Sequence, residues 1–367
     1  MNNTTANIKI PHNTILFDEI NCLLHRESLY CPSFRWPPSL HIRNRHQIIQ
    51  WFYKLVDYFD YDREVAAISI DLLDRFVLLQ NSFKTFTADR YKVIAMTCLY
   101  LAVKIYIGVA GEGKCQEEKP FFSLEEYIRL HDVQMQTKDI ADMELCILGT
   151  LQWKVNPVSS MCFVHYFLRL GLPLKTSAMK TSSEQANLNC KTDLHQKMGI
   201  VREVLYKLAL SFAEYAIYLP MTTLYFCLDC DRNGKMSYKA ISPSIVAYAS
   251  ILLAMEMLSY SALPSDLRES FVLRCMQLRT PNGFILHPDQ KDVKEIKAKI
   301  QDYIQPKTGL GLYDFCEKFP ILLTAMKEGI LMTSFCNQRK EELNRGFLLS
   351  PKSSNVKALA QSHINTV

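Results

Sequence analysis

Apolar residues recur every three or four positions along most of the chain, the period of an amphipathic α-helix. In the stretch 45–59, Ile48, Phe52, Val56 and Phe59 share one helical face. Comparable patterns predict helices over residues 15–30, 64–79, 87–107 and 137–153, with a further helix starting at Ser123. Short β-branched runs between turn dipeptides, which mark strands, do not recur. The pattern therefore predicts an all-α protein.

A second series of helical patterns follows Asn156-Pro157 and resembles the first series in its order. It covers residues 159–170, 199–218, 244–258, 266–278 and 289–304. When the segment Lys92–Lys104 is aligned with Ser244–Glu256, apolar and small residues coincide at almost every position. The economical interpretation is a pair of weakly similar five-helix bundles.

These patterns predict five parts along the chain. An N-terminal segment with a short helix covers 1–39 and ends at the extended run Trp36-Pro37-Pro38, because a residue before proline avoids helical geometry. The first bundle covers 40–156 and the second 157–308. An extra C-terminal helix is expected over 309–342, and a polar, disordered tail over 343–367.

Composition excludes several classes of protein. Hydrophobic residues make up 49% and charged residues 22%, as in soluble globular proteins, and the net charge of +5 is too small and dispersed to predict a nucleic-acid partner. The stretch Val93–Ala110 is nearly all apolar, but Lys104 interrupts it, so we expect a central bundle helix and no membrane span. Met1–Lys9 lacks the pattern of a secretory signal, and the 12 Cys are scattered; reduced thiols and a nuclear or cytoplasmic location are expected.

No motif predicts a metal, a cofactor or catalytic residues. The run Asp229–Ser237 follows the start of a calcium-binding EF-hand loop, but Ala240 stands where the bidentate Glu belongs, so we expect a solvated loop. Cys227 and Cys230 form a Cys-x-x-Cys pair without the second pair that zinc requires. An enzyme that uses either cysteine is the least favoured hypothesis.

Arg45 lies on the apolar stripe of its own predicted helix, three and seven residues before Ile48 and Phe52. A guanidinium stays charged in a protein, so its burial requires an anion. Asp74 shares a face with the apolar residues of the next helix and can supply one. We predict an Arg45–Asp74 ion pair that fixes the packing of two helices and has no active role.

Five ordered landmarks resemble the cyclin box of the cyclins, the regulatory subunits of cyclin-dependent kinases. The resemblance covers about 40–155 well and 157–305 more weakly. The landmarks are Arg45-x5-Trp51-Phe52, Leu73-Asp74-Arg75-Phe76, Leu101-Ala102-Val103-Lys104, Asp142-Met143-Glu144 and Leu148-xx-Leu151-xx-Trp153. The resemblance implies tandem five-helix cyclin-box bundles.

The resemblance also implies a kinase-binding site at Lys104 and Glu144, with Ile105 beside them. On this interpretation the two charges bracket an apolar groove and bind the ends of a partner helix. By position alone, both side chains could equally extend to water from the rim of the core. Glu256 replaces the lysine in the second bundle, so one kinase per chain is expected.

The implied function is that of a non-catalytic subunit that binds and activates a cyclin-dependent Ser/Thr kinase in cell-cycle control. In many cyclins an apolar patch on the first box helix docks substrates, and here only Ile48 and Trp51 keep that character. Ordinary substrate docking there is therefore doubtful. The alternative hypothesis is a cyclin-fold transcription factor or scaffold that activates no kinase.

Overall fold

The computed structural model describes residues 12–30, 39–80, 87–110, 136–172, 188–219, 225–230, 236–278, 286–304, 325 and 329–331. The helix expected from Ser123, most of the expected C-terminal helix and the tail lie outside the described residues. The chain divides into two compact units. One contains Pro32–Pro157 and Pro220–Ala240, and the other contains Met1–Cys31, Val158–Leu219 and Ile241–Phe347.

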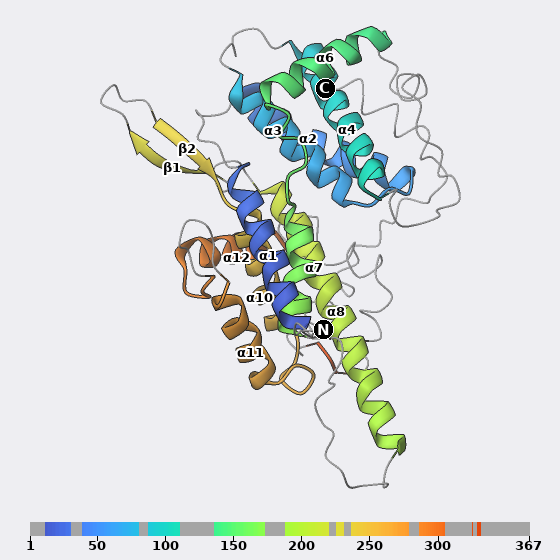
Figure 1. Cartoon of the computed structure of the whole chain (residues 1–367), viewed down its shortest axis with the longest axis vertical. Helices are drawn as coiled ribbons and strands as arrows, with labels where there is room; N and C mark the ends of the chain where they lie inside the picture. The colour runs from blue at the N-terminus through green and yellow to red at the C-terminus, as the bar shows by residue number, and fades with distance from the viewer. Residues whose placement is uncertain are drawn as a thin grey trace, which may run out of the picture. The chain divides into compact units, whose positions relative to one another are not determined.

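The first unit is built around α4 (Ala88–Ala110), which packs against α2 (Ser39–Tyr58), α3 (Glu64–Leu79) and α6 (Thr137–Thr150) (Figure 1). Because neighbours cover several of its sides, α4 is apolar on most of its surface; Ile94, Ala95 and Cys98 are fully buried. Among the described helices, none has the length and hydropathy needed to cross a bilayer. The apolar stretch around α4 is thus core sequence.

Polar side chains define where these helices begin. The Thr87 hydroxyl accepts a hydrogen bond from the Arg90 amide at 3.2 Å and caps α4. Asp139 accepts one from the Gln136 amide at 3.0 Å at the start of α6. This helix ends at Thr150, before the predicted end at Trp153, because Gln152 and Trp153 adopt left-handed backbone angles, with φ of 52° and 60°.

The second unit repeats this arrangement around α10 (Pro243–Met257). It contains α7 (Ser160–Gly171), α8 (Leu188–Tyr218), α11 (Ser265–Met276) and α12 (Lys291–Ile304), and α10 packs against α7, α8 and α12 (Figure 1). The predicted all-α fold with tandem bundles is confirmed. One boundary differs: α8 starts at Leu188 and not at Gly199, where the helical pattern predicted its start.

The N-terminal helix α1 (His12–Ser28) belongs to the second unit and packs against α7. Its buried Glu27 accepts hydrogen bonds from the Ser244 amide at 2.6 Å and the Ser244 hydroxyl at 2.8 Å. These donors lie at the first turn of α10, where backbone N–H groups have no partner within the helix. The sequence pattern predicted a separate segment over residues 1–39, because no local pattern around Glu27 reveals Ser244 as its partner.

A β-hairpin corrects the expectation that the chain has no strands. Strand β1 (Tyr225–Cys230) pairs in antiparallel register with β2 (Met236–Ala240), with an irregularity between Cys227 and Asp229. The two ends of the run that resembles an EF-hand loop, Asp229–Cys230 and Met236–Ser237, therefore belong to strands, and residues 231–235, where a solvated loop was expected, lie outside the described residues. The alternation of residues around Tyr238 is a strand pattern, but it is too short to distinguish a strand from a loop.

Residues near the C-terminus close the end of α10. Ile330 and Leu331 are buried, the Ser259 amide donates to the Ile330 carbonyl at 2.8 Å, and Leu331 forms a bridge with Leu258. Gly329 has a φ of +66°, which favours glycine at this turn. The described part of the C-terminal region is thus a structural component of the second bundle.

Gly171 allows α7 to approach α11 closely, because a Cβ at this position would overlap the ring of the buried Phe271. We predict that Gly171→Ala lowers the free energy of unfolding in urea by about 1–3 kcal/mol, the usual cost of overpacking. Gly199→Ala is the matched control, since its Cβ meets no atom within 4 Å. The control should stabilise the helix by about 0.5–1 kcal/mol, and equal effects of the two changes would contradict the close packing.

Glu27→Ala tests whether α1 is part of the second bundle. The substitution leaves the Ser244 donors without their buried acceptor, so we predict a loss of about 1–3 kcal/mol in the free energy of unfolding. Asp18→Ala, an exposed acid on the same helix, should change it by less than about 0.5 kcal/mol. Urea unfolding of the full chain provides the measurement, and a Glu27 variant as stable as the control would show that α1 is not anchored there.

Candidate functional site

The packing of α4 against α6 brings Lys104 and Glu144 together. The Lys104 Nζ lies 2.5 Å from the Glu144 Oε1, and the side chains are 39% and 18% exposed. The ammonium also lies 5.2 Å from the centroid of the Tyr100 ring. These two charges, 40 residues apart in the sequence, therefore share one surface site.

Apolar surface adjoins this ion pair. Ile105 follows Lys104 and is half-buried, and Leu145 follows Glu144 with 64% of its surface exposed. Along α6, Ala141, Leu145 and Gly149 are exposed at a spacing of four residues, so they lie on one face without a long charged side chain. A large exposed leucine thus adjoins the paired cation and carboxylate on this surface.

The ion pair contributes little to folding. Pairs that remain accessible to water stabilise proteins by about 0–1 kcal/mol, because solvent screens the charges and ordering the side chains costs entropy. The fold of the first unit therefore does not require Lys104 and Glu144.

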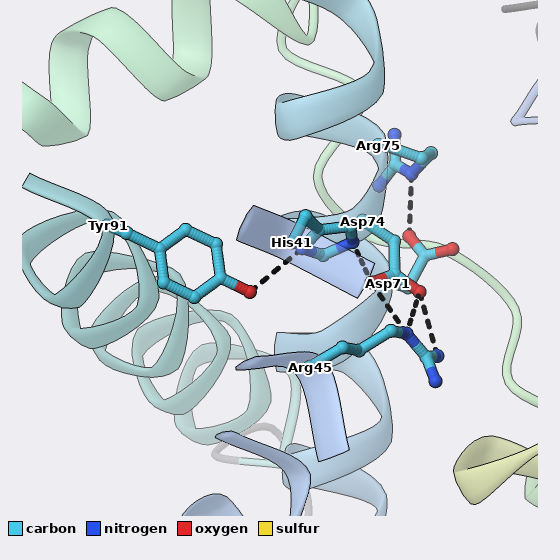
Figure 2. A network of polar contacts seen from close by, with 6 residues as sticks. All are labelled: His41, Arg45, Asp71, Asp74, Arg75 and Tyr91. Carbon is cyan, nitrogen blue, oxygen red and sulfur yellow. Dashed lines mark hydrogen bonds and ion pairs between the residues drawn. The ribbon is translucent and has the colours of Figure 1, made fainter. Parts of the chain in front are cut away.

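A buried polar network in the core fixes the helices that carry this site (Figure 2). Arg45 on α2 forms a two-pronged ion pair with Asp74 on α3: Nη2 lies 2.8 Å from Oδ2, and Nε lies 3.0 Å from Oδ1. Both side chains are at least nine-tenths buried. The structure thus forms the pair predicted from the sequence, and it joins α2 to α3.

His41 extends the network to α4, which the sequence analysis did not anticipate. Its Nε2 lies 3.0 Å from the Asp74 Oδ1, and its Nδ1 lies 2.8 Å from the Tyr91 hydroxyl (Figure 2). Because a carboxylate only accepts hydrogen bonds, the Nε2 carries the proton and the Nδ1 accepts from Tyr91. The available signal was that His41 precedes Arg45 by four residues and therefore lies on the same helical face.

The network keeps Asp74 ionised. Burial alone would raise the pKa of the Asp74 carboxyl, but the charge of Arg45 and the hydrogen bond from His41 outweigh it and lower the pKa to about 2. Burial, together with the charge of Asp74, raises the pKa of the Tyr91 hydroxyl, so Tyr91 remains a neutral donor. At neutral pH the core therefore contains a carboxylate matched to a guanidinium.

Arg75 connects α3 to the segment that follows α6. Its Nε donates to the Asp71 carboxylate at 2.6 Å (Figure 2). Its Nη1 donates to the Lys154 carbonyl at 2.8 Å. The adjacent residues Asp74 and Arg75 thus fix α2 on one side and the end of α6 on the other. This explains why both charges of the Leu73–Phe76 motif are largely buried.

The second unit has an ion pair at the corresponding positions with the charges exchanged. Glu256 aligns with Lys104, and its Oε1 lies 2.7 Å from the Nζ of Lys297 on α12, the counterpart of α6. The residues of this pair are 41 positions apart, compared with 40 for Lys104 and Glu144. The two bundles therefore present opposite charge polarity at equivalent sites.

The remaining predicted site residues lie apart from this pair. Ile48 is 5% exposed and contributes to the core, whereas Trp51 is half-buried and its ring lies 5.4 Å from that of Phe52. Of the two, only Trp51 has surface available to a substrate. Over the described residues, no group of three or more His, Cys, Asp or Glu could hold a metal ion. The side chains of Cys227 and Cys230 lie outside the described residues.

Comparisons with known proteins show similarity to cyclins over part of the chain. Residues 18–156 match the family described as "Cyclin, N-terminal domain". Cyclin-D4-1 of Oryza sativa subsp. japonica is 29% identical over 133 residues, which are 36% of this chain and 34% of the relative. Cyclin-D3-3 of Arabidopsis thaliana is 25% identical over 125 residues, or 34% of this chain and 32% of the relative. Among solved structures, a viral cyclin from herpesvirus saimiri aligns with 79% of this chain and 96% of its own, at a TM-score of 0.42 and 15% identity.

The matches cover about a third of the length of these curated relatives. The family match covers part of α1 and the first bundle, and the landmarks around Arg45, Asp74, Lys104 and Glu144 all fall within residues 18–156. Residues 18–156 thus match a cyclin N-terminal domain, and the resemblance drawn from the sequence is confirmed for this part of the chain.

The buried network predicts a specific acid response. A carboxyl whose pKa is lowered by folding stabilises the protein above its unfolded pKa, and this contribution disappears as the pH falls through the folded value. Asp74→Asn should therefore lower the free energy of unfolding by about 3–5 kcal/mol at pH 7. The difference from wild type should shrink between about pH 4 and pH 2, as Asp74 becomes protonated.

Urea unfolding from pH 2 to pH 7 measures this difference. Asp57→Asn is the matched control, because Asp57 also pairs with an arginine, Arg63, at 2.7 Å but is 45% exposed. The control should cost at most about 1 kcal/mol. An Asp74 variant with the stability of the Asp57 variant would contradict a buried, ionised Asp74.

Proposed function

We propose that this chain is a cyclin that binds and activates a cyclin-dependent Ser/Thr kinase. It acts as a non-catalytic regulatory subunit in the control of cell division, in the nucleus or the cytoplasm. The observation that carries the proposal is the juxtaposition of Lys104 and Glu144 beside exposed Leu145. The match of residues 18–156 to a cyclin N-terminal domain supports the same function.

The site has the chemistry to bind an amphipathic helix. A helix exposes backbone carbonyls at its C-terminal end and N–H groups at its N-terminal end, with partial charges of opposite sign. Lys104 can donate to such carbonyls and Glu144 can accept from such N–H groups, while Leu145 and Ile105 cover an apolar face. Charge-assisted hydrogen bonds are about twice as strong as neutral ones, so the pair also sets the direction of the bound helix.

Activation follows if this helix is the regulatory αC helix of the kinase. Catalysis requires a glutamate on αC to pair with the β3 lysine, so the helix must occupy its inward position. A partner that binds only that position shifts the equilibrium by its differential affinity for the two states. Moving the active fraction from about 1% to about 99% takes about 5.5 kcal/mol. This chain needs to supply no reacting group.

One kinase binds each chain. In the second bundle Glu256 and Lys297 present the opposite polarity, so a helix bound in the same direction would place carbonyls against a carboxylate. That juxtaposition is repulsive. The second bundle therefore does not bind the same feature of a kinase.

Charge reversal tests the site by co-precipitation from a cell lysate, with the captured kinase identified by mass spectrometry. Wild type should capture a cyclin-dependent kinase, whereas Lys104→Glu and Glu144→Lys should each reduce capture at least about tenfold. Both variants should stay folded by circular dichroism, because the pair contributes at most about 1 kcal/mol to stability.

The equivalent changes in the second bundle, Glu256→Lys and Lys297→Glu, are matched controls. They break an ion pair that is also accessible to solvent, at a corresponding position, and should leave kinase capture unchanged. Kinase capture by both first-bundle variants at the wild-type level would overturn the site. Failure of wild type to capture any kinase would favour a cyclin-fold scaffold or transcription factor.

A further inference from the structure

The outward face of α1 carries large apolar side chains that are open to solvent. The inward face packs against α7 of the same unit and buries Leu16, Ile20 and Leu24 (Figure 1). On the outward face Ile15 is 45% exposed and Leu29 is 52% exposed. Covering such side chains with another molecule is favourable, because it removes apolar surface from water.

The spacing of the outward residues suits packing against another helix. Cys22, which is also exposed, lies seven positions after Ile15 and seven before Leu29. Residues at this spacing form a line along one side of a helix, and such lines are the contact surfaces of paired helices. The line from Ile15 to Leu29 extends over about 21 Å of the helix axis.

The charged residues on the two sides of Cys22 have opposite signs. Asp18 and Glu19 lie four and three positions before it, and His25 and Arg26 lie three and four positions after it. Asp18, Glu19 and His25 are exposed, and Arg26 is half-buried. Within the described part of the chain none of these four side chains forms an ion pair.

Arg26 in particular has no carboxylate against it in the described part of the chain. Its Nε is shielded from water and makes no hydrogen bond there. Arg26 and Glu19 both lie within electrostatic range of the Tyr166 hydroxyl, at the boundary with α7. A half-buried guanidinium in this state gains from a carboxylate that another molecule supplies.

The outward face is self-complementary when two copies of α1 run antiparallel. With Cys22 on the twofold axis, each residue before Cys22 faces the residue at the same distance after Cys22 in the second copy. The facing pairs are Ile15 with Leu29 of the second copy, Asp18 with Arg26 of the second copy, and Glu19 with His25 of the second copy. A parallel arrangement would place each charge against its own kind, which is repulsive. The pattern therefore favours a twofold, isologous contact.

We propose that two copies of this chain associate through the outward faces of their α1 helices, which run antiparallel with Cys22 at the centre. Ile15 and Leu29 cover one another, and the acids of each helix pair with the basic residues of the other. One pair of helices buries less surface than a standard interface, so the dissociation constant is on the order of 10 μM. The proposal does not depend on a kinase, because α1 belongs to the second unit whereas Lys104 and Glu144 belong to the first.

Sedimentation velocity of the full chain in reducing buffer measures the association. Wild type should change from monomer to dimer between about 1 μM and about 300 μM. Asp18→Arg places two arginines together at each end of the contact and should weaken association at least about tenfold. Asp266→Arg is the matched control, because it reverses an exposed acid in the first turn of α11 and should leave association unchanged.

A charge exchange within one chain tests the antiparallel orientation. Arg26→Asp alone should weaken association as Asp18→Arg does, because it places two carboxylates together. The double variant, Asp18→Arg with Arg26→Asp, again sets an arginine against a carboxylate, but only if the helices run antiparallel. It should associate like wild type. A folded double variant that stays monomeric would overturn the proposed pairing.

Cross-linking locates the centre of the contact. Bismaleimidoethane, a short linker between thiols, should join Cys22 to Cys22 of the second copy, and mass spectrometry of the linked peptides identifies the product. Cys22→Ser should lose this product. Cys146 is the internal control, because it is also exposed but lies on α6 and should form no comparable link to its own copy.

If Arg26→Asp does not fold by circular dichroism, Leu29→Glu replaces it, with Leu273→Glu at an exposed leucine of α11 as its control. The first change should abolish the dimer, and the control should preserve it. The proposal is overturned if wild type remains monomeric at about 300 μM. It is equally overturned if Asp18→Arg or Leu29→Glu associates as tightly as wild type, or if the cross-linked dimer lacks the Cys22 link.

Discussion

The buried charge of Arg45 is the constraint on which the first bundle depends. A guanidinium inside a protein requires a paired carboxylate, and the packing of α2 on α3 places Asp74 against it. His41 links α2 to α4 through its hydrogen bond with Tyr91. Arg75 links α3 to the chain beyond α6 through the Lys154 carbonyl. The positions of the two helices that carry the candidate site thus follow from a network within the core.

The buried charges of the core and the surface ion pair have different physical roles. In the core, charges are desolvated and fully paired, so they fix geometry but are not accessible to a partner. On the surface, the Lys104–Glu144 pair is partly solvated, contributes little to folding and can exchange its internal contact for contacts with another protein. The exchanged polarity of Glu256 and Lys297 indicates that the bundle architecture accepts either orientation of the pair. The fold therefore does not dictate the polarity at the first bundle, and we propose that the bound partner does.

The sequence predicted those parts of the fold that obey local rules. Helical periodicity located most helices, and the requirement that a buried cation meet an anion identified Arg45 and Asp74. Other features depend on contacts between distant segments, such as Glu27 with Ser244, or on the close approach at Gly171. The hairpin was missed because two short strands give too weak an alternation. Lys104 and Glu144 were singled out through the family resemblance, and their proximity became visible only in the packing of α4 against α6.

The most direct test of the account exchanges the two charges in one chain, Lys104→Glu together with Glu144→Lys. The exchange recreates the polarity found at Glu256 and Lys297, so the internal ion pair is restored and the free energy of unfolding should stay within about 0.5 kcal/mol of wild type. If the pair binds the ends of a kinase helix, the folded double variant captures no cyclin-dependent kinase from a lysate. Capture at the wild-type level would show that the pair serves only to join α4 to α6.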